Sequence, residues 1–248
     1  MGASFDKGRF LIDAAVDAEE VRRVLQAYAP WRHRIDFSCG VSSADFETFK
    51  PFNDTPTSKI LSVEHELGPL TGFKRALDIG CNAGYNSIYL AERHGMEVVG
   101  MDFSDRHVKV ATELARLTGT RSCSFLQGNA ETFVDPKGFD LVVHFGTLYH
   151  LKNPVLALET ALKNLRPGGM LLIETQLYGW PWETRAKFIY GLGGDNTNWW
   201  ALGERSLLRI CEVLGARAER VGHRHRLRTF HQYRAYFKVV KPKAAARA

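Results

Sequence analysis

The residues best suited to binding chemistry follow short apolar runs, and the clearest group is Ala76-Leu-Asp-Ile-Gly-Cys-Asn-Ala-Gly84. Glycines in such a turn let a ligand approach the backbone at the end of a strand. The G-x-G-x-x-G fingerprint of dinucleotide sites needs a glycine at position 82, where this chain has Asn82. Asp78 would repel phosphates and attract an ammonium group. The segment therefore disfavours pyrophosphate, and the alternative to a ligand site is a plain glycine-containing turn.

A second group is Val98-Val-Gly-Met-Asp-Phe-Ser104, which places an acid 18 residues beyond Gly84. The carboxylate of Asp102 can accept both hydroxyls of a ribose at this position. The alternative is that Asp102 caps the following helix, a role that Ser104 or Asp105 can also fill. We predict that Asp102 is a ribose ligand.

A third group is Gln127-Gly-Asn-Ala-Glu131, after the next apolar run. The Asn129 side chain and the backbone amides that follow it can read the edge of an adenine. Together the three groups predict a site for a cationic molecule that carries a ribose and an adenine.

The elements between these groups follow a βαβ pattern, in which short apolar runs alternate with longer amphipathic stretches. We expect strands at 75–79, 97–101, 122–127, 140–145 and 170–175. We expect helices at 87–94, 106–117 and 154–165. The turn Arg166-Pro-Gly-Gly169 would end the last helix. Residues 74–175 therefore predict a parallel sheet.

The flanks differ from this pattern. Residues 17–28 predict a short amphipathic helix and residues 30–57 are irregular, so this part must pack on a core that the rest supplies. Residues 176–203 hold seven aromatic side chains among 28 residues, which indicates an insertion with its own role. At the C-terminal end we expect a helix at 204–214 and two strands at 216–221 and 233–240. A basic loop at 222–232 would join the two strands.

Composition restricts the class of protein. The 248 residues carry 33 Lys or Arg and 27 Asp or Glu, a formal charge of +6, and 45% of them are hydrophobic, as in a globular chain. No run approaches the ~18 apolar residues of a membrane span, and no secretory signal is visible, so we expect a soluble, cytoplasmic protein. The four separated cysteines show no spacing for a disulfide framework or a metal site.

The basic excess lies at one end of the chain. Residues 203–248 hold twelve Lys or Arg and three Glu, a net charge of +9, so the first 202 residues sum to −3. Arg220, Arg224, Arg226 and Arg228 form a basic hairpin that can bind phosphates, and a solvated loop is the alternative. Any contact with nucleic acid would use this end.

Residues 74–175 resemble the class I S-adenosyl-L-methionine (SAM)-dependent methyltransferases. The signatures are LDIGCNAG, VVGMDFS, GNAETF, FDLVVHFGTLYHL and LKNLRPGGMLLIET. The resemblance implies that SAM contacts Asp78, Gly80, Cys81, Asn82, Gly84, Asp102, Phe103, Asn129, Ala130 and Phe145. Asp78 would help to hold the amino group, Asp102 the ribose hydroxyls, and Asn129 the adenine. At position 129 the family more often has Asp, and Asn keeps an acceptor oxygen.

A closer resemblance is to the branch that includes the bacterial tRNA wobble-uridine carboxymethyltransferases. It rests on Phe145-Gly-Thr-Leu-Tyr-His150, Asn153-Pro154, Ile173-Glu-Thr175, Asn198-Trp-Trp200 and the final helix and strands. In the tRNA enzyme the donor is carboxy-SAM, held partly by a tyrosine of the LYH motif and an arginine before the last strand. Tyr149 and Arg234 match these positions. The lysine that the tRNA enzyme adds from its N-terminal part has no recognisable counterpart in residues 1–70.

Methyl transfer from a sulfonium is an in-line displacement, so the alignment of donor and acceptor supplies most of the acceleration. A base is needed only when the acceptor must lose a proton. Tyr149 and His150 follow the fourth strand, at the sheet edge where the methyl would emerge, and are our candidates for positioning the acceptor and removing its proton. The alternatives are a tyrosine that only packs and a histidine that caps the helix at Pro154.

Three further features are secondary. His144 falls on a core-facing position by strict alternation, so we expect a satisfied core histidine. Glu174 ends the fifth strand, where an acid points toward the ligand edge or binds a backbone amide. The aromatic insertion would form a lid over the acceptor, and the alternative is a small core of Trp180, Phe188 and Trp199.

We therefore predict an α/β fold with a doubly wound, seven-stranded, mostly parallel sheet of the Rossmann-like class I methyltransferase type. Residues 1–70 would form a helical cap on the substrate side, and residues 71–248 the SAM-binding domain with its insertion at 176–203. The predicted reaction transfers a methyl group from SAM to an O or N of a small metabolite, without a metal or a membrane.

Three alternatives stay open. The first is modification of a tRNA wobble uridine with SAM or carboxy-SAM, with the basic C-terminal hairpin on the RNA. The second is consumption of SAM through its aminocarboxypropyl arm, by cyclisation or transfer, with release of methylthioadenosine. The third is a SAM-binding module without catalysis.

Overall fold

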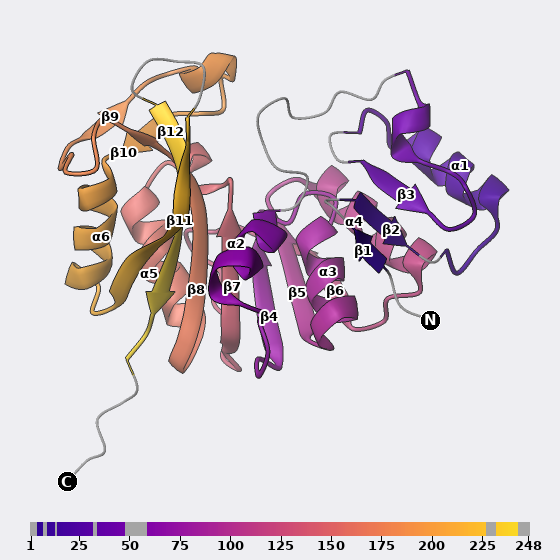
Figure 1. Cartoon of the computed structure of the whole chain (residues 1–248), viewed down its shortest axis with the longest axis horizontal. Coiled ribbons are helices and arrows are strands. Elements are labelled where there is room, and N and C mark those ends of the chain that lie inside the picture. Colours follow the sequence, from indigo (N-terminus) through magenta and orange to yellow (C-terminus); the bar gives the residue numbers. More distant parts are fainter. Residues whose placement is uncertain are drawn as a thin grey trace, which may run out of the picture.

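A nine-stranded sheet forms the centre of the molecule (Figure 1). The computed structural model describes residues 4–6, 9–12, 14–31, 34–47, 59–226 and 232–242. The strands of the sheet are β4 (Arg75–Ile79), β5 (Glu97–Asp102), β6 (Cys123–Gln127), β7 (Phe139–Phe145), β8 (Leu165–Tyr178), β9 (Ala186–Phe188), β10 (Trp200–Leu202), β11 (Arg217–Arg226) and β12 (Gln232–Val240). Seven of them follow one path in the order β11-β12-β8-β7-β4-β5-β6, and β10 joins β8 to β9.

The order of the strands reverses at the middle of the sheet. β4 pairs in parallel with β5 on one side and with β7 on the other, while β12 and β11 continue beyond β8 as antiparallel strands. Open α/β sheets bind ligands at the carboxyl ends of the strands next to such a reversal. The prediction of a doubly wound, mostly parallel sheet is confirmed, and the carboxyl ends of β4, β5 and β7 are the expected place for a site.

Helices cover both faces of the sheet. The helices are α1 (Ala18–Ala27), α2 (Lys59–Leu67), α3 (Tyr85–His94), α4 (Asp105–Thr118), α5 (Pro154–Asn164) and α6 (Glu204–Val213). Apolar residues of the first four helices share one core cluster with Val98 and Val143. Those of α5 and α6 share a second cluster with Val142, which alternates with Val143 along β7. The sheet therefore separates two cores.

The N-terminal part adds a small sheet of its own. β1 (Ser4–Asp6) pairs antiparallel with β2 (Arg9–Ile12), which pairs in parallel with β3 (Ile35–Phe37), and a short 3-10 helix, η1 (Ser43–Asp45), follows. The prediction of an irregular segment at 30–57 is wrong for β3 and η1, which are too short to show a period. α1 buries Val21 and Leu25 in the core cluster of α3 and α4, as the amphipathic pattern indicates.

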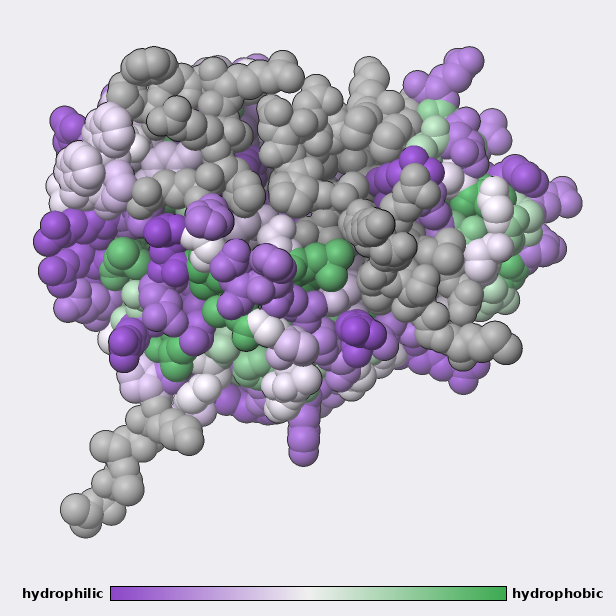
Figure 2. Space-filling model, in the orientation of Figure 1, coloured by the Kyte–Doolittle hydropathy of each residue, from purple (hydrophilic) through white to green (hydrophobic). Residues whose placement is uncertain are grey.

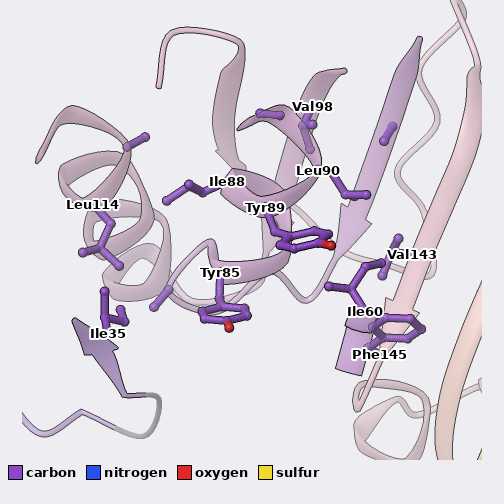
Figure 3. Close-up of a cluster of buried hydrophobic side chains, with 14 of the residues drawn as sticks. Ile35, Ile60, Tyr85, Ile88, Tyr89, Leu90, Val98, Leu114, Val143 and Phe145 are labelled. Carbon is purple, nitrogen blue, oxygen red and sulfur yellow. The ribbon is translucent and has the colours of Figure 1, made fainter. Parts of the chain in front are cut away.

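α2 is a helix that the sequence analysis did not identify, because nine residues are too few for a clear helical period. It buries Ile60 and Val63, and Figure 3 shows Ile60 beside Phe145 at the end of β7. This packing places the first residue of the helix, Lys59, at the carboxyl edge of the sheet.

Two predicted boundaries differ from the structure. Residues 165–169 belong to β8, because Leu165 pairs with Phe139 and the Gly168 amide donates to the carbonyl of Lys241 (3.0 Å). The strand expected to end at position 221 continues, because its pairing with β12 resumes at His225 after an irregularity. The expected basic loop is correspondingly shorter, and its residues 227–231 lie outside the described residues.

The described residues visible in Figure 2 are mainly hydrophilic, with hydrophobic residues in small separate groups. Within the described ranges, no helix combines the length and the apolar content that crossing a membrane requires.

One buried arginine links the starts of three strands. Arg75 donates to Glu97 (3.0 Å), to Asp135 (2.9 Å) and to the carbonyl of Gly138 (2.9 Å), and its guanidinium lies over the Phe139 ring. Its side chain is 9% exposed. We expect Arg75→Ala to lower the free energy of unfolding by about 3 kcal/mol in urea titrations, because the partners lose their charge compensation.

Arg116→Ala is the matched control. Arg116 also pairs with two acids, Glu20 and Glu113, but its side chain is 43% exposed. Exposed pairs contribute less than about 1 kcal/mol. Equal losses in the two variants would contradict the argument from burial.

Candidate functional site

The turn between β4 and α3 is bonded to the end of β5. The amides of Gly80 and Cys81 donate to the carbonyl of Met101 (2.8 and 3.0 Å), and the Asn82 amide donates to Oδ2 of Asp102 (3.0 Å). Gly80 and Asn82 have φ angles of +72° and +50°, which only glycine and a few polar residues adopt readily. The first two predicted groups thus form one unit.

The turn after β7 contacts this unit. A Cβ on Gly80 would overlap the Thr147 hydroxyl, which donates to the carbonyls of Ile79 (3.2 Å) and Phe145 (3.3 Å). Only a glycine fits at position 80, for this reason and for its φ. The sequence analysis did not single out Thr147, because the contact joins two distant turns and leaves no local pattern.

Asp78 lies behind the turn and is 1% exposed. Its Oδ2 accepts a hydrogen bond from the Ser87 hydroxyl (2.7 Å). Burial raises the pKa of Asp78 to about 6, although the hydrogen bond from Ser87 acts to lower it. The negative charge of Asp102 adds to the rise. A buried carboxylate with few partners gains strongly from a nearby cation.

Asp102 stays ionised. Burial opposes this, but hydrogen bonds from His107 Nδ1 (3.1 Å) and the Ser104 amide (2.9 Å) lower the pKa of Asp102. Ser104 caps α4, so the alternative of Asp102 as the cap is wrong. A carboxylate has about four acceptor positions, and the three hydrogen bonds named above leave capacity for a ribose hydroxyl.

The third group lies beside the second. The Gly128 amide donates to the carbonyl of Asp102 (3.0 Å), and the Gln127 side chain donates to that of Phe103 (2.9 Å). Phe103 is 78% exposed, Ala130 is buried, and the Asn129 side-chain oxygen accepts from the Glu131 amide (2.8 Å). One lone pair of that oxygen is therefore already used.

A polar cluster lies at the carboxyl end of β8, and we name it the Glu174 cluster: Lys59, Tyr149, Glu174 and Arg234. The Glu174 carboxylate is 1% exposed and lies 2.8 Å from Lys59 Nζ and 2.9 Å from Arg234 Nη1. Arg234 Nη2 donates to the Tyr149 hydroxyl (2.8 Å). The predicted pair Tyr149 and Arg234 is thus brought together, and Lys59 is an addition that no sequence signal marked.

Charge governs this cluster. Burial acts to raise the pKa of Glu174, but Lys59 and Arg234 outweigh it and hold that pKa below its ordinary value. Two cations face one carboxylate, so the cluster carries about one net positive charge. A Cβ on Gly146 would overlap Lys59 Nζ and lie 3.4 Å from the Tyr149 hydroxyl, so the turn after β7 passes directly along the cluster. The alternative, in which the Glu174 carboxylate binds a neighbouring backbone amide, is wrong, because the carboxylate contacts Lys59 and Arg234.

His150 lies in a short 3-10 helix, η2 (Leu148–His150). Its Nδ1 is 2.9 Å from the carbonyl of Thr197 and 3.1 Å from the Thr197 hydroxyl. Burial lowers the pKa of His150, with the Thr197 hydrogen bond opposing. Asn153 caps α5, so the alternative of His150 as the cap is wrong.

His144, a predicted core residue, and Phe145, a predicted SAM contact, are both buried. His144 is fully buried, and burial lowers its pKa to about 4. Neither ring nitrogen has a hydrogen-bond partner among the residues that the structure describes, so the prediction of a satisfied histidine is wrong in that respect. The Phe145 ring packs edge-on against Tyr236, with 5.9 Å between centroids.

Four of the seven aromatic side chains of the segment 176–203 face solvent: Trp180, Trp182, Phe188 and Tyr190. Trp180 stacks on Trp182, with 5.6 Å between centroids, and Phe188 packs on Trp200. Trp180 and Phe188 are 53% and 61% exposed, so the alternative of a small core around them is wrong. Trp199 joins the segment to η2, since its amide donates to the carbonyl of Tyr149 (2.9 Å).

In the parts of the chain that the structure describes, no group of three or more His, Cys, Asp or Glu side chains has the arrangement of a metal site.

Several known proteins are similar to this chain. Residues 71–188 match the family model of the methyltransferase domain. The tRNA U34 carboxymethyltransferase of Desulfotalea psychrophila is 31% identical over 159 residues, 63% of this chain and 47% of that protein. The ubiquinone biosynthesis O-methyltransferase of Idiomarina loihiensis is 33% identical over 129 residues, 51% of this chain and 52% of that protein. The chain thus spans about half the length of these curated relatives.

Solved structures share the fold at low identity. The N-terminal domain of EvdMO1, in the presence of SAH and D-fucose, has a TM-score of 0.68 and 18% identity, over 96% of this chain and 100% of that chain. The [4+2]-cyclase SpnF has a TM-score of 0.62 and 17% identity, over 91% and 94% of the two chains. The predicted Rossmann-like fold is confirmed, and the predicted class agrees with the match of residues 71–188 to the methyltransferase domain.

We expect Asp78→Asn to stabilise the ligand-free protein. The folded pKa of about 6 lies above the ordinary value of 3.8, so the stability that Asp78 contributes is complete below pH 4 and is lost as the pH rises through 6. The variant should gain about 1–3 kcal/mol in free energy of unfolding at pH 8 and less at pH 5, measured in urea. Asp105→Asn, at an exposed carboxylate, should show no such pH-dependent gain. A loss of stability at pH 8 in Asp78→Asn would refute the assignment.

Proposed function

We propose that the chain binds SAM at the carboxyl ends of β4 and β5 and transfers its methyl group to an O or N of a small metabolite. The observation that carries the proposal is the unit formed by the 80–84 turn and Asp102, with the buried carboxylate of Asp78 behind it. It combines close backbone approach, a ribose acceptor and negative charge for a cationic cofactor. The match of residues 71–188 to a methyltransferase domain supports it.

The chain's own residues then have separate tasks. SAM, when bound, supplies an electrophilic methyl group on a sulfonium. The turn at Gly80, confined by Thr147, would fix the methionine part, while Asp78 favours its cationic amino group. Tyr149 and His150 would hold the acceptor in line and receive its proton, so that most of the acceleration comes from alignment.

The first test is binding of SAM and of S-adenosylhomocysteine by calorimetry. We expect Asp102→Ala to weaken both by about 10- to 100-fold, because hydrogen bonds to a charged group contribute roughly 1.5–3 kcal/mol. Asp105→Ala, three residues along the chain and exposed, is the control and should bind within about twofold of the wild type. Unchanged binding in Asp102→Ala would remove the ribose assignment, and no binding in the wild type would remove the proposed function.

A small acceptor is favoured over RNA by the state of the C-terminal cations. The structure describes the side chains of seven of these cations, and five of the seven have partners inside the protein. The pairs are Arg209 with Glu212, Arg220 with Glu204, Arg234 with Glu174, Lys238 with Glu219, and Lys241 with the carbonyls of Leu162 and Leu165. Cations that are engaged in this way offer less charge to a phosphate backbone.

The Glu174 cluster supports a second candidate, transfer of a carboxymethyl group from carboxy-SAM. Its net positive charge and the Tyr149 hydroxyl suit a donor with an additional carboxylate. Relatives named tRNA U34 carboxymethyltransferase also point to it. Against it stands Glu174, which already takes hydrogen bonds from both cations.

A competition experiment separates the two donors. We expect the wild type to bind SAM at least as tightly as carboxy-SAM, because Glu174 neutralises one of the two cations. Arg234→Gln should change SAM affinity by less than about fivefold, with Arg209→Gln on α6 as the control for a lost surface charge. Tighter binding of carboxy-SAM that disappears in Arg234→Gln would establish the second candidate instead.

A further inference from the structure

The position of the ring proton on His150 follows from what Nδ1 contacts. A backbone carbonyl only accepts hydrogen bonds, and that of Thr197 lies 2.9 Å from Nδ1. Nδ1 therefore carries the proton, and in the neutral ring Nε2 holds the free lone pair. Nε2 has no hydrogen-bond partner among the described residues, and it is not a buried atom.

The Asp195 carboxylate supports the contact between Thr197 and His150. The Thr197 hydroxyl donates to Oδ1 of Asp195 (2.7 Å), and the Thr197 amide donates to the same oxygen (2.9 Å). Because the Thr197 hydroxyl donates its proton to Asp195, its oxygen can accept a hydrogen bond from His150 Nδ1 at 3.1 Å. Asp195, Thr197 and His150 thus form a continuous chain of hydrogen bonds.

This chain ends at the candidate site. The His150 ring lies 4.4 Å from that of Tyr149, centroid to centroid, and Tyr149 is part of the Glu174 cluster. Among the described residues, the charged groups that act on His150 are Asp195 from the loop that holds Thr197, Arg234 from β12 and Lys59 from α2. The Trp199 amide also binds η2, so the aromatic segment and His150 are held as one piece.

We propose that Asp195 and Thr197 are positioning residues that present His150 Nε2 as a general base to an acceptor that must lose a proton, a hydroxyl or an ammonium group. The inference rests on the proposed function and specifies its acceptor class. For a hydroxyl acceptor, an oxygen lone pair forms the new bond to the methyl carbon while the carbon–sulfur bond breaks toward sulfur. The hydroxyl proton passes to Nε2. The positive charge moves from the sulfonium to the imidazolium, which Asp195 stabilises through Thr197.

The test is the nitrogen NMR signal of His150, recorded against pH in uniformly labelled protein with and without S-adenosylhomocysteine. His150→Gln identifies the signal. We expect the Nδ1–H tautomer, and in Asp195→Asn a midpoint of protonation lower by roughly 0.3–0.5 pH unit, because a nearby negative charge is removed while its hydrogen-bonding oxygen is kept. Glu212→Gln, an exposed acid on α6, should leave the midpoint unchanged.

An Nε2–H tautomer, or an unchanged midpoint in Asp195→Asn, would overturn the inference. Both readouts exist in the ligand-free protein, so a failure to bind S-adenosylhomocysteine would count against the proposed function alone. A purely structural role of Asp195 predicts loss of stability without a shift of the midpoint, and the two outcomes are therefore distinct.

Discussion

The buried carboxylate of Glu174 sets the strictest constraint on this structure. A charge with 1% exposure must be compensated within the protein, and removing one partner of such a pair typically costs 3–5 kcal/mol. The compensation comes from Lys59 on α2 and Arg234 on β12, two elements that are far apart in sequence. Their meeting on β8 fixes the turn after β7, since Gly146 lies against Lys59. The same turn confines Gly80 through Thr147, so the proposed cofactor half of the site depends on the same ion pairs.

Sequence reasoning identified the parts of the site that are local. Asp78, the 80–84 turn and Asp102 each lie at the end of a strand, where the period of apolar residues and the glycine spacing show the strand, the turn and the helix together. Lys59 and Thr147 act through contacts between distant segments, and neither residue type nor spacing marks such contacts. The same limit explains α2, β3 and β9, whose three to nine residues depend on tertiary packing rather than on their own period.

Local rules are broken at two buried residues of the central sheet. Asp78 is an acid whose burial favours the protonated form, and His144 has two ring nitrogens without partners in the described structure. Natural proteins tolerate such departures mainly at functional positions, where other contacts offset their cost. The fold alone does not define the reaction, because the [4+2]-cyclase SpnF shares it at a TM-score of 0.62. The argument for methyl transfer therefore rests on the residues at the strand ends.

The electrostatics of the site divide between its two halves. Asp78 and Asp102 make the β4 and β5 side negative, which suits a sulfonium and an ammonium group. The Glu174 cluster makes the β8 and β12 side positive by about one charge, and preorganised charges of this kind favour an acceptor that becomes anionic as it loses its proton. His150 stands beside the positive side. Its burial, to which the positive charges of Arg234 and Lys59 add, lowers the pKa of His150, which favours the neutral ring that can accept that proton. The division of charge thus favours an acidic hydroxyl over an amine as the acceptor group.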